Sequence, residues 1–284
     1  MKLISFIQNN QNTYGVVTNS NKVLDLGPIL GVQFPDLVSL LAHQDLSPVQ
    51  KALDTHQATL DFDNLTLLPV IPNPGKIFCI GLNYDEHVKE TNKEKTEAPV
   101  IFARFSESQV AHNEAIVLPP ESFKLDYEGE IAIVIGKGGR RISEEDSWDH
   151  IAGYACYNDG SIRDWQTATS QWTPGKNFWK TGGFGPWLVT SDEIAPKQTL
   201  TLITRLNGQE MQRATTDMLI HSIPRQIAYI SSFLPLNPGD VIVTGTPGGV
   251  GAKRNPPVFM KEGDIVEIEV DAVGVLRNSI KKEA

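Results

Sequence analysis

Residues 126–136, DYEGEIAIVIG, decide the fold, because an apolar run follows two glutamates that are spaced two residues apart. A strand over Glu128–Ile135 alternates its side chains between two faces, so Glu128 and Glu130 share one face and the isoleucines share the other. Two neighbouring carboxylates repel each other unless a positive charge lies between them, and hard divalent cations prefer carboxylate oxygens. The stretch therefore predicts a metal site or, since glutamate is seldom buried, an exposed strand face with solvated carboxylates.

Apolar and alternating runs recur along the chain and predict further strands. The expected strands cover residues 3–7, 14–18, 22–26, 77–80, 100–104, 151–156, 187–190, 200–206, 241–244 and 265–270. The expected helices cover residues 36–43, 47–59, 143–150 and 223–233. Many strands joined by long Gly/Pro-rich connections are typical of a β-rich α+β chain built on a rolled sheet or sandwich.

A cluster of helix and strand breakers divides the sequence. Pro69, Pro72, Pro74 and Gly75 precede the apolar stretch KIFCIGLNY. Such punctuation marks a domain boundary. We therefore expect a small N-terminal domain over residues 1–72 and a main domain over residues 73–284.

The composition excludes several classes of protein. The 284 residues include 34 acidic and 25 basic side chains, a formal charge of −9, which disfavours nucleic-acid binding. No segment approaches the ~18 apolar residues of a membrane span, and the few apolar residues before the polar run at residues 8–11 are too short for the apolar core of a signal peptide. Cys79 and Cys156 form no CxxC pair, which favours a reducing compartment. We expect a cytoplasmic protein that binds neither nucleic acid nor membrane.

The loop YNDGSIRD, residues 157–164, follows the apolar stretch GYAC. It places Asp159 and Arg163 at the end of a strand, where rigid scaffolds commonly support functional side chains. The alternative is an Asx-type turn at Asn158, which needs no function.

The segment GLNYDEHVKE, residues 81–90, contains His87 and Glu90 three positions apart. In a helical turn these side chains are neighbours, so the carboxylate can orient the imidazole and raise its basicity. The alternative is a surface helix whose charges are solvated.

Five motifs in order, from about Lys76 to Asn278, together resemble the fumarylacetoacetate hydrolase family. They are DYEGEIAIVIG, NDGSIRDWQ, GKNF with GPW, GDVIVTGTPGGVG and EGDIVEIEVDAVGVLRN. The resemblance implies a mixed β-sandwich roll with a small N-terminal α+β domain. It also implies that Glu128, Glu130 and Asp159 hold Mg²⁺, Mn²⁺ or Ca²⁺.

The resemblance also assigns roles to other positions. His87 and Glu90 correspond to a pair on a lid that activates water, and Lys176 of GKNF corresponds to a catalytic lysine. The positions that correspond to substrate contacts are Tyr84, Arg104, Arg163, Gln166 and Thr246. Many members have a lysine where this chain has Arg104, and a glycine-rich segment where it has residues 110–115 with His112, so we expect the substrate pocket to differ there.

The function that the resemblance implies is metal-dependent hydrolysis of a carbon–carbon bond. The region GKNFW to TGGFGPW looks most like members acting on acylpyruvates or 2,4-dioxo-3-deoxy sugar acids, which release pyruvate and a carboxylic acid. Oxaloacetate decarboxylation and enol–keto isomerisation or hydration are the alternatives, because they pass through the same metal-bound enolate. A non-catalytic cation-binding module is a third hypothesis. Family members are commonly homodimers, and we expect the same here.

Overall fold

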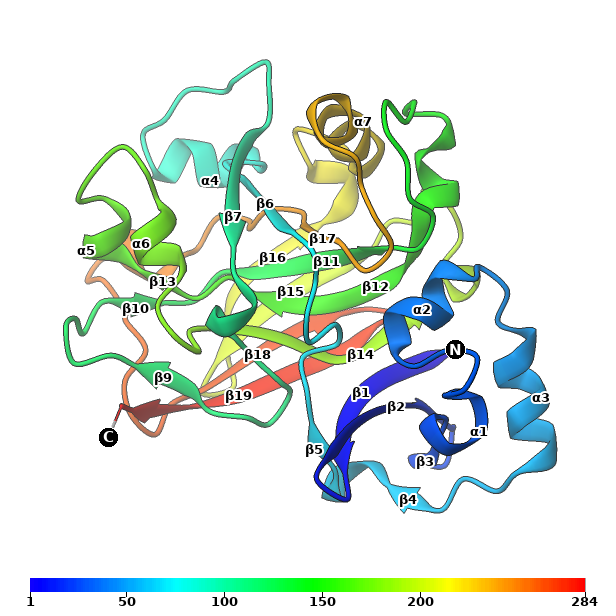
Figure 1. The fold of residues 1–284 in the computed structure, drawn as a ribbon. Coiled ribbons are helices and arrows are strands. Elements are labelled where there is room, and N and C mark those ends of the chain that lie inside the picture. Colours follow the sequence, from blue (N-terminus) through cyan, green and yellow to red (C-terminus); the bar gives the residue numbers. More distant parts are fainter. Residues whose placement is uncertain (284) are drawn as a thin grey trace.

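The computed structural model describes residues 1–283, and its β-rich α+β architecture confirms the expected fold class (Figure 1). The large sheet has twelve strands. Its path runs β4 (Leu60–Asp61), β3 (Lys22–Asp25), β2 (Gln11–Val17), β1 (Lys2–Gln8), β14 (Gly182–Thr190), β12 (Ile151–Asn158), β11 (Gly129–Ile135), β17 (Val241–Val243), β6 (Ile77–Gly81) and β7 (Val100–Arg104), with β5 (Thr66–Leu67) beside β1 and β8 (Gln109–Val110) beside β14.

A second sheet packs against the first and closes the sandwich. Its order is β16 (Gln209–Thr215), β15 (Thr201–Leu206), β18 (Ile265–Val270), β19 (Gly274–Lys282) and β9 (Ile116–Leu118). A short ladder of β10 (Leu125–Asp126) and β13 (Ser161–Ile162) lies beside the sandwich.

Strand β11 shows the expected alternation, and both of its faces are buried. Ile131 and Ile133 belong to the core between the two sheets, together with Leu202 of β15. Ala132 and Val134 face a second core on the opposite side of the large sheet. The two glutamates therefore continue the face of Ala132 and Val134 at the end of a strand that is buried on both sides.

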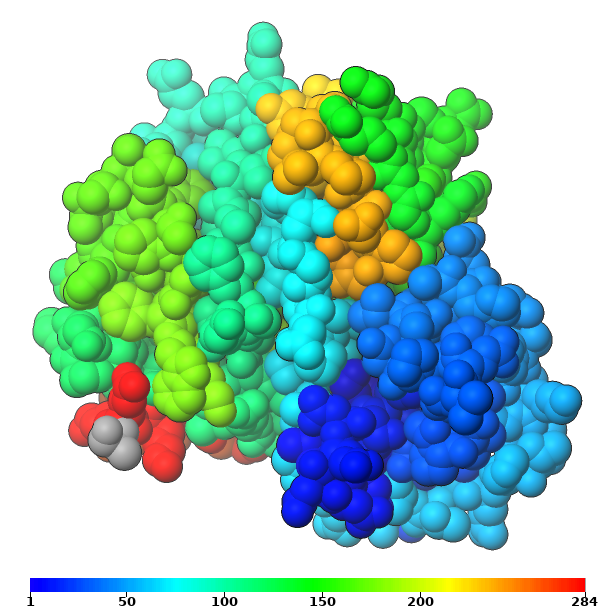
Figure 2. Space-filling model, viewed as in Figure 1, coloured from blue at the N-terminus to red at the C-terminus, as the bar shows by residue number. Residues whose placement is uncertain are grey.

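The N-terminal meander is continuous with the large sheet. Strand β1 pairs antiparallel with β14, so that Leu3 lies opposite Leu188. In Figures 1 and 2 the first 60 or so residues, in blue, form the lower right part of the molecule. The sheet thus crosses the expected boundary after residue 72, and the division into two domains stays a prediction.

The helices are short, and their bounds only partly follow the sequence expectation. They are α1 (Gly27–Leu30), α2 (Leu37–Ala42), α3 (Ser47–Thr55), α4 (Asp85–Glu90), α5 (Arg163–Gln166), α6 (Thr173–Lys176) and α7 (Ile223–Phe233). Helix α7 has the predicted bounds, whereas α3 ends before residue 59 because Leu60 pairs with Val23 in extended form. The predicted helix 143–150 is only a 3₁₀ turn over Asp146–His150, which leads directly into β12. Among residues 1–283, no helix is long and apolar enough to cross a membrane.

Candidate active site

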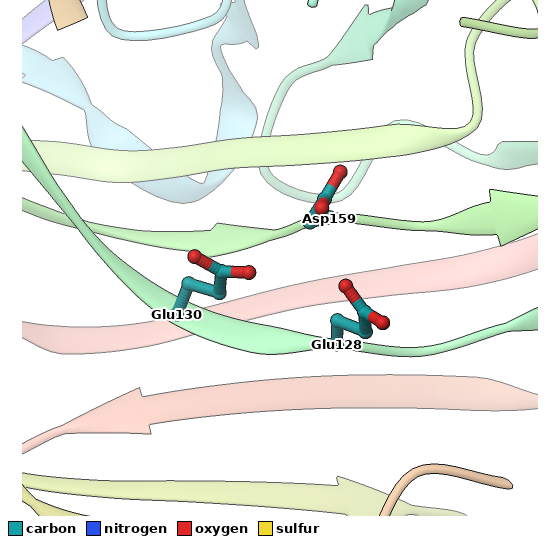
Figure 3. Close-up of side chains that lie close together, drawn as sticks. All are labelled: Glu128, Glu130 and Asp159. Carbon is teal, nitrogen blue, oxygen red and sulfur yellow. The ribbon is translucent and has the colours of Figure 1, made fainter. Parts of the chain in front are cut away.

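Three buried carboxylates meet where β11 and β12 run side by side. Gly129 pairs with Asn158, and the N–H of Asp159 donates to the carbonyl oxygen of Glu128 at 2.8 Å. This register places Asp159 beside Glu128 and Glu130, and one carboxylate oxygen of each lies within 4.8 Å of the others. Figure 3 shows the two glutamates side by side at the start of β11, with Asp159 just past the end of the neighbouring strand β12. The exposed strand face that the sequence also allowed is excluded.

Three cations surround this cluster, of which Lys176 and Arg104 are buried and Arg163 is partly buried. Lys176 Nζ lies 2.6 Å from Glu128 Oε2 and 2.5 Å from Asp159 Oδ2. Arg163 Nη1 lies 2.6 Å from Glu128 Oε1, and Arg104 Nη1 lies 2.5 Å from Asp159 Oδ1. Glu130 differs from the other two carboxylates, because within residues 1–283 it forms no ion pair. Its Oε2 accepts only the N–H of Gly245, at 2.5 Å.

The charges of the cluster fit a divalent cation. Burial, together with the charges of Asp159 and Glu128, raises the pKa of Glu130 well above its usual range. Burial also acts to raise the pKa of Glu128, but Arg163 and Lys176 outweigh it, so that this pKa is lowered. Glu130 therefore needs a further positive charge nearby to stay ionised. Three converging carboxylates are a donor set that Mg²⁺, Mn²⁺ or Ca²⁺ favours.

Helix α4 carries an ordered histidine–glutamate pair. His87 Nδ1 lies 2.7 Å from Glu90 Oε1, and Glu90 Oε2 accepts the N–H of Gly249 at 2.9 Å. An ionised carboxylate only accepts hydrogen bonds, so Nδ1 carries the proton and Nε2 is left as the basic nitrogen. His87 is 6% exposed, which excludes the solvated surface helix as its explanation.

The start of α4 is fixed to the loop after β17. Asn83 Nδ2 donates to the carbonyl oxygens of Thr244 at 2.7 Å and His221 at 3.1 Å. Asn83 Oδ1 accepts the N–H of His221 at 2.7 Å. This anchor holds His87 near the Gly245 backbone that binds Glu130.

A cavity of about 1070 Å³ opens over the carboxylates. The expected site residues that line it are His87, Glu128, Glu130, Arg163, Gln166, Lys176 and Thr246. A smaller cavity of about 280 Å³, beside Trp148 and Tyr154, contains none of them, so the larger cavity is the one that matters for the chemistry.

Some of the hydrogen-bonding groups on the cavity wall already have partners within the protein. Arg163 Nε donates to Asp126 Oδ2 at 2.8 Å and Nη1 donates to Gln166 Oε1 at 2.9 Å, whereas its buried Nη2 has no partner within residues 1–283. Thr246 donates its hydroxyl proton to the carbonyl oxygen of Gly129 at 3.0 Å and accepts from Gln212 Nε2 at 2.9 Å. Arg163 therefore has a free donor for an anion, whereas the Thr246 hydroxyl has none.

Two residues expected to contact substrate do not line the cavity. Arg104 is 2% exposed, and its guanidinium is directed at Asp159 and the loop around Ser108. The Tyr84 side chain is buried, and burial raises the pKa of its phenol. Its backbone is extended and forms an isolated β-bridge with Leu219. The substrate role of both residues therefore stays a prediction, since the direction of a side chain at a strand end depends on contacts distant in the sequence.

The segment 110–115 also lies away from the cavity. Val110 belongs to β8, which pairs with β14. His112 packs near the ring of Phe62, and its Nδ1 accepts the N–H of Arg277 at 3.1 Å. The departure from the family pattern at these positions therefore does not shape the pocket.

Several residues of the site were not identified from the sequence. Asp126 is fully buried and accepts hydrogen bonds from Arg163 and from the backbone of Gly251 and Ala252. Lys176 Nζ also lies 4.9 Å from the centre of the Phe102 ring. Asp126 had a detectable signal, since it stands two residues before Glu128 at the start of the same apolar run.

Comparison with known proteins gives a consistent family assignment. The family profile described as "Fumarylacetoacetate (FAA) hydrolase C-terminal" matches residues 76–281. The protein named "Oxaloacetate tautomerase fahd2, mitochondrial" from Xenopus laevis is 44% identical over 237 residues, which are 83% of this chain and 74% of that protein.

Two solved structures align with this chain over the full length of both chains. The structure titled as a putative HpcE protein from Mycobacterium smegmatis is 33% identical, with a TM-score of 0.89. Maleylpyruvate hydrolase from Sphingobium sp. SYK-6, in complex with manganese(II) ion and pyruvate, is 28% identical, with a TM-score of 0.83. The β-rich fold is thus shared over its full length.

Proposed function

The chain belongs to the fumarylacetoacetate hydrolase family, and from that premise we propose that it is a divalent-metal-dependent tautomerase of oxaloacetate or a similar 2-oxo acid. This is the isomerase alternative of the sequence analysis, and it replaces acylpyruvate hydrolysis as the main hypothesis. The name carried by a 44% identical relative supports the substrate. The geometric observation that supports it is the His87–Glu90 pair at 2.7 Å on a cavity that also contains two of the three clustered carboxylates.

Enol–keto tautomerisation needs one proton to move. The enol hydroxyl at C2 loses a proton and C3 gains one, while no carbon–carbon bond breaks and no water is consumed. In the proposed reaction, His87 Nε2 accepts the hydroxyl proton and delivers it to C3. Glu90 holds the ring through Nδ1 and stabilises the imidazolium formed between these two transfers.

The remaining residues position the substrate and stabilise its charge. A divalent cation held by Glu128, Glu130 and Asp159 supplies Lewis acidity, which lowers the energy of negative charge on the substrate oxygens. We propose Mg²⁺ or Mn²⁺ for this role, with Ca²⁺ as an alternative. The free Nη2 of Arg163 binds the substrate carboxylate, with Gln166 beside it. Lys176 has two of its three N–H groups on carboxylates and offers the third to the C2 oxygen.

Hydrolysis of a 2,4-dioxo acid is the second candidate. The same His87–Glu90 pair can take a proton from water, which then attacks the C4 carbonyl, and breakage of the C3–C4 bond releases pyruvate. A cavity of about 1070 Å³ has room for an acyl group, and the similar maleylpyruvate hydrolase provides a precedent at 28% identity. Decarboxylation of oxaloacetate is distinguished from tautomerisation by the release of pyruvate and CO₂, and from hydrolysis by the substrate that gives the pyruvate.

The test compares three reactions in one preparation of protein loaded with Mg²⁺ or Mn²⁺. Enol oxaloacetate is added, and the loss of its ultraviolet absorbance is followed. Pyruvate is measured in parallel from oxaloacetate and from acetylpyruvate. We expect rapid enol loss and no pyruvate above the background without protein. Pyruvate formed without faster enol loss would replace the tautomerase by a decarboxylase or a hydrolase, according to which substrate gives it.

The metal requirement has its own control. Dialysis against EDTA is expected to abolish the acceleration, and re-addition of Mn²⁺ is expected to restore it. Tautomerisation that persists at full rate in EDTA would contradict the role of the three carboxylates.

A further inference from the structure

Gln212 is a buried polar side chain that contacts the strand of the carboxylate cluster from the opposite sheet. It is 2% exposed and belongs to β16 of the second sheet, whereas β11 belongs to the large sheet. It does not line the cavity, and the proposed mechanism does not use it. A buried amide is stable only when it is hydrogen-bonded, so its partners show which parts of the protein it holds together.

The amide of Gln212 joins two segments of the site. Its Oε1 accepts the N–H of Gly129 at 3.0 Å, and this glycine lies between the two glutamates of the cluster. Its Nε2 donates to Thr246 Oγ1 and to the carbonyl oxygen of Pro247, both at 2.9 Å. Gln212 therefore connects the strand that carries two of the carboxylates to the loop after β17.

Backbone groups fix the orientation of this amide. The N–H of Gly129 can only donate and the carbonyl oxygen of Pro247 can only accept, so the oxygen and nitrogen of the side chain cannot exchange places. Nε2 must therefore donate to Thr246, whose own hydroxyl proton goes to the carbonyl oxygen of Gly129 at 3.0 Å. Gly129, Gln212 and Thr246 thus form a closed ring, in which each residue donates one hydrogen bond to the next.

The glycine between the two glutamates allows Gln212 to reach this peptide. A Cβ atom at Gly129 would lie 1.9 Å from Thr204 Oγ1, and Thr204 pairs with Gln212 across β15 and β16. Any larger residue at position 129 would push β11 away from the second sheet. The sequence EGE therefore combines two carboxylates on one face of the strand with close contact to the second sheet on the other.

The loop on the other side of the ring orients Glu130. Gly245 directly precedes Thr246, and its N–H donates to Glu130 Oε2 at 2.5 Å. Gly245 has a φ of +111°, and a Cβ atom there would lie 2.6 Å from Asn83 Cβ, so the loop has little freedom to adjust. The direction of the Glu130 carboxylate therefore depends on where the ring holds this loop.

We propose that Gln212 is a positioning residue of the metal centre and that it acts through Gly129 and Thr246. It keeps the peptide between the two glutamates and the loop that orients Glu130 in a fixed relation, and it contacts neither the cation nor the substrate. Groups that orient metal ligands typically contribute about 10–100-fold to metal affinity. The inference rests on the proposed function only in that the carboxylate cluster holds a divalent cation.

The experiment measures Mn²⁺ binding to the full-length protein by calorimetry, in the absence of substrate. Gln212→Met keeps the length of the side chain but removes all three hydrogen bonds, so it is expected to weaken Mn²⁺ binding about 10–100-fold. Gln212→Asn keeps an amide that is too short to close the ring. It is expected to bind Mn²⁺ more weakly than the wild type and more tightly than Gln212→Met.

The double variant S5A/Y14F is the matched control for a loss of stability. Ser5 and Tyr14 are buried and donate to the carbonyl oxygens of Val70 at 2.9 Å and Phe34 at 2.6 Å, and neither lines the cavity. The free energy of unfolding of this variant is expected to fall, because two buried carbonyl groups lose their partners. Its Mn²⁺ affinity is expected to equal that of the wild type.

Several outcomes would overturn the proposal. One is a Mn²⁺ affinity within about threefold of the wild type in Gln212→Met or, if that variant does not fold, in Gln212→Asn, because a positioning group contributes more than this. Another is an equal loss of affinity in S5A/Y14F. Failure of both Gln212 variants to fold beside a folded S5A/Y14F would assign Gln212 to stability alone.

The test separates this inference from the proposed reaction. Because metal binding is measured without substrate, a failed tautomerase assay leaves the result for Gln212 valid. A wild type that does not bind Mn²⁺ would refute the metal centre of the proposed function itself, and the inference with it.

Discussion

Arg104 is the residue at which the structure most changes the interpretation of the site. All five N–H donors of its guanidinium are used, on Asp159, Gly160, Thr181 and both oxygens of Ser108. It therefore holds one oxygen of Asp159 and leaves the other to face the cluster. These contacts position Asp159, a proposed metal ligand, and a lysine with three donors cannot reproduce them in full.

Removal of Arg104 is expected to destabilise the protein strongly. Arg104→Met leaves the buried carboxylate of Asp159 without its partner, so we expect a loss of about 3–5 kcal/mol in the free energy of unfolding. Urea denaturation in EDTA measures it. Arg104→Lys is expected to lose less, and Mn²⁺ is expected to recover part of the loss, because a bound cation restores positive charge beside Asp159. A stability of Arg104→Met equal to that of the wild type would contradict this role.

The His87–Glu90 pair is expected to determine the rate of proton transfer. His87→Ala is expected to lower the rate of tautomerisation by about 10²–10⁴-fold, the usual contribution of a positioned acid–base group. Glu90→Gln keeps the shape but removes the charge that stabilises the imidazolium, so it is expected to lower the rate less. Calorimetry should show unchanged Mn²⁺ affinity in both variants. Unaltered tautomerisation by His87→Ala would remove the pair from the mechanism.

The residues of the site differ in how far the sequence alone could predict them. The pairing of Glu128 with Glu130 and of His87 with Glu90 follows from the local periods of a strand and a helix. The position of Lys176 between two carboxylates depends on a contact 48 residues away in the chain. Only the family resemblance indicated Lys176. It carries no information about side-chain direction, so it could not show that Arg104 and Tyr84 lie outside the cavity lining.

At the scale of secondary-structure elements, prediction succeeded where one local pattern determined the element. Helix α7 has an apolar face and the cap residue Ser222, and its bounds match the prediction. The pairing of β1 with β14 joins Leu3 to Leu188, and no local pattern encodes such a distant contact. The same limit applies to α3, whose end depends on the pairing of Leu60 with a distant strand.

His112 links three such distant elements and gives a prediction on pH. Burial and the charge of Arg277 lower the pKa of His112 from 6.5 to about 4, although Asp63 acts in the opposite direction. Between these values the unfolded chain binds a proton that the folded chain does not. Stability is therefore complete above pH 6.5 and is lost as the pH falls towards 4, by roughly 2 kcal/mol once partial exposure is allowed for.

The measurement is the difference in unfolding free energy between wild type and His112→Gln from pH 7 to pH 4. Glutamine keeps an acceptor for the N–H of Arg277 but does not titrate, so the variant should lose less stability over this range. Other histidines and carboxylates titrate equally in both proteins and cancel in the difference. Parallel curves for the two proteins would show that His112 does not contribute.

At the scale of the whole molecule, the net charge of the chain is negative, whereas the cavity is lined by several cationic side chains. Five lysine and arginine side chains line the cavity, whereas the chain as a whole has an excess of nine acidic charges. The composition disfavours nucleic acid as a partner class, which stays a prediction, and it did not indicate this local positive charge. That local charge arises because folding brings together lysines from residues 93 to 253.

The expected homodimer is also a property of the whole molecule. Phe105, Phe123, Trp165 and Trp179 are exposed. Contacts of these residues or their chain neighbours join them into one region of the surface: the Trp165 ring packs 5.2 Å from Phe178, the N–H of Phe105 donates to Asn177, and Ser122 donates to Asp164. Exposed aromatic patches of this kind mark protein interfaces. We expect the 31.3 kDa chain to sediment at twice its mass.

The variant F123D/W179D tests whether this aromatic region is the dimer interface. Two carboxylates buried against a second copy cost more than hydrophobic contacts return, so the variant should sediment as a monomer at concentrations where the wild type is a dimer. Val32→Asp is the matched control, because Val32 is a fully exposed apolar residue of the N-terminal part and is expected to leave the dimer intact. A monomeric wild type would refute the dimer, and dissociation of Val32→Asp would place the interface elsewhere. Since the cavity over the carboxylate cluster lies within one chain, the monomeric variant is expected to keep the proposed tautomerase activity.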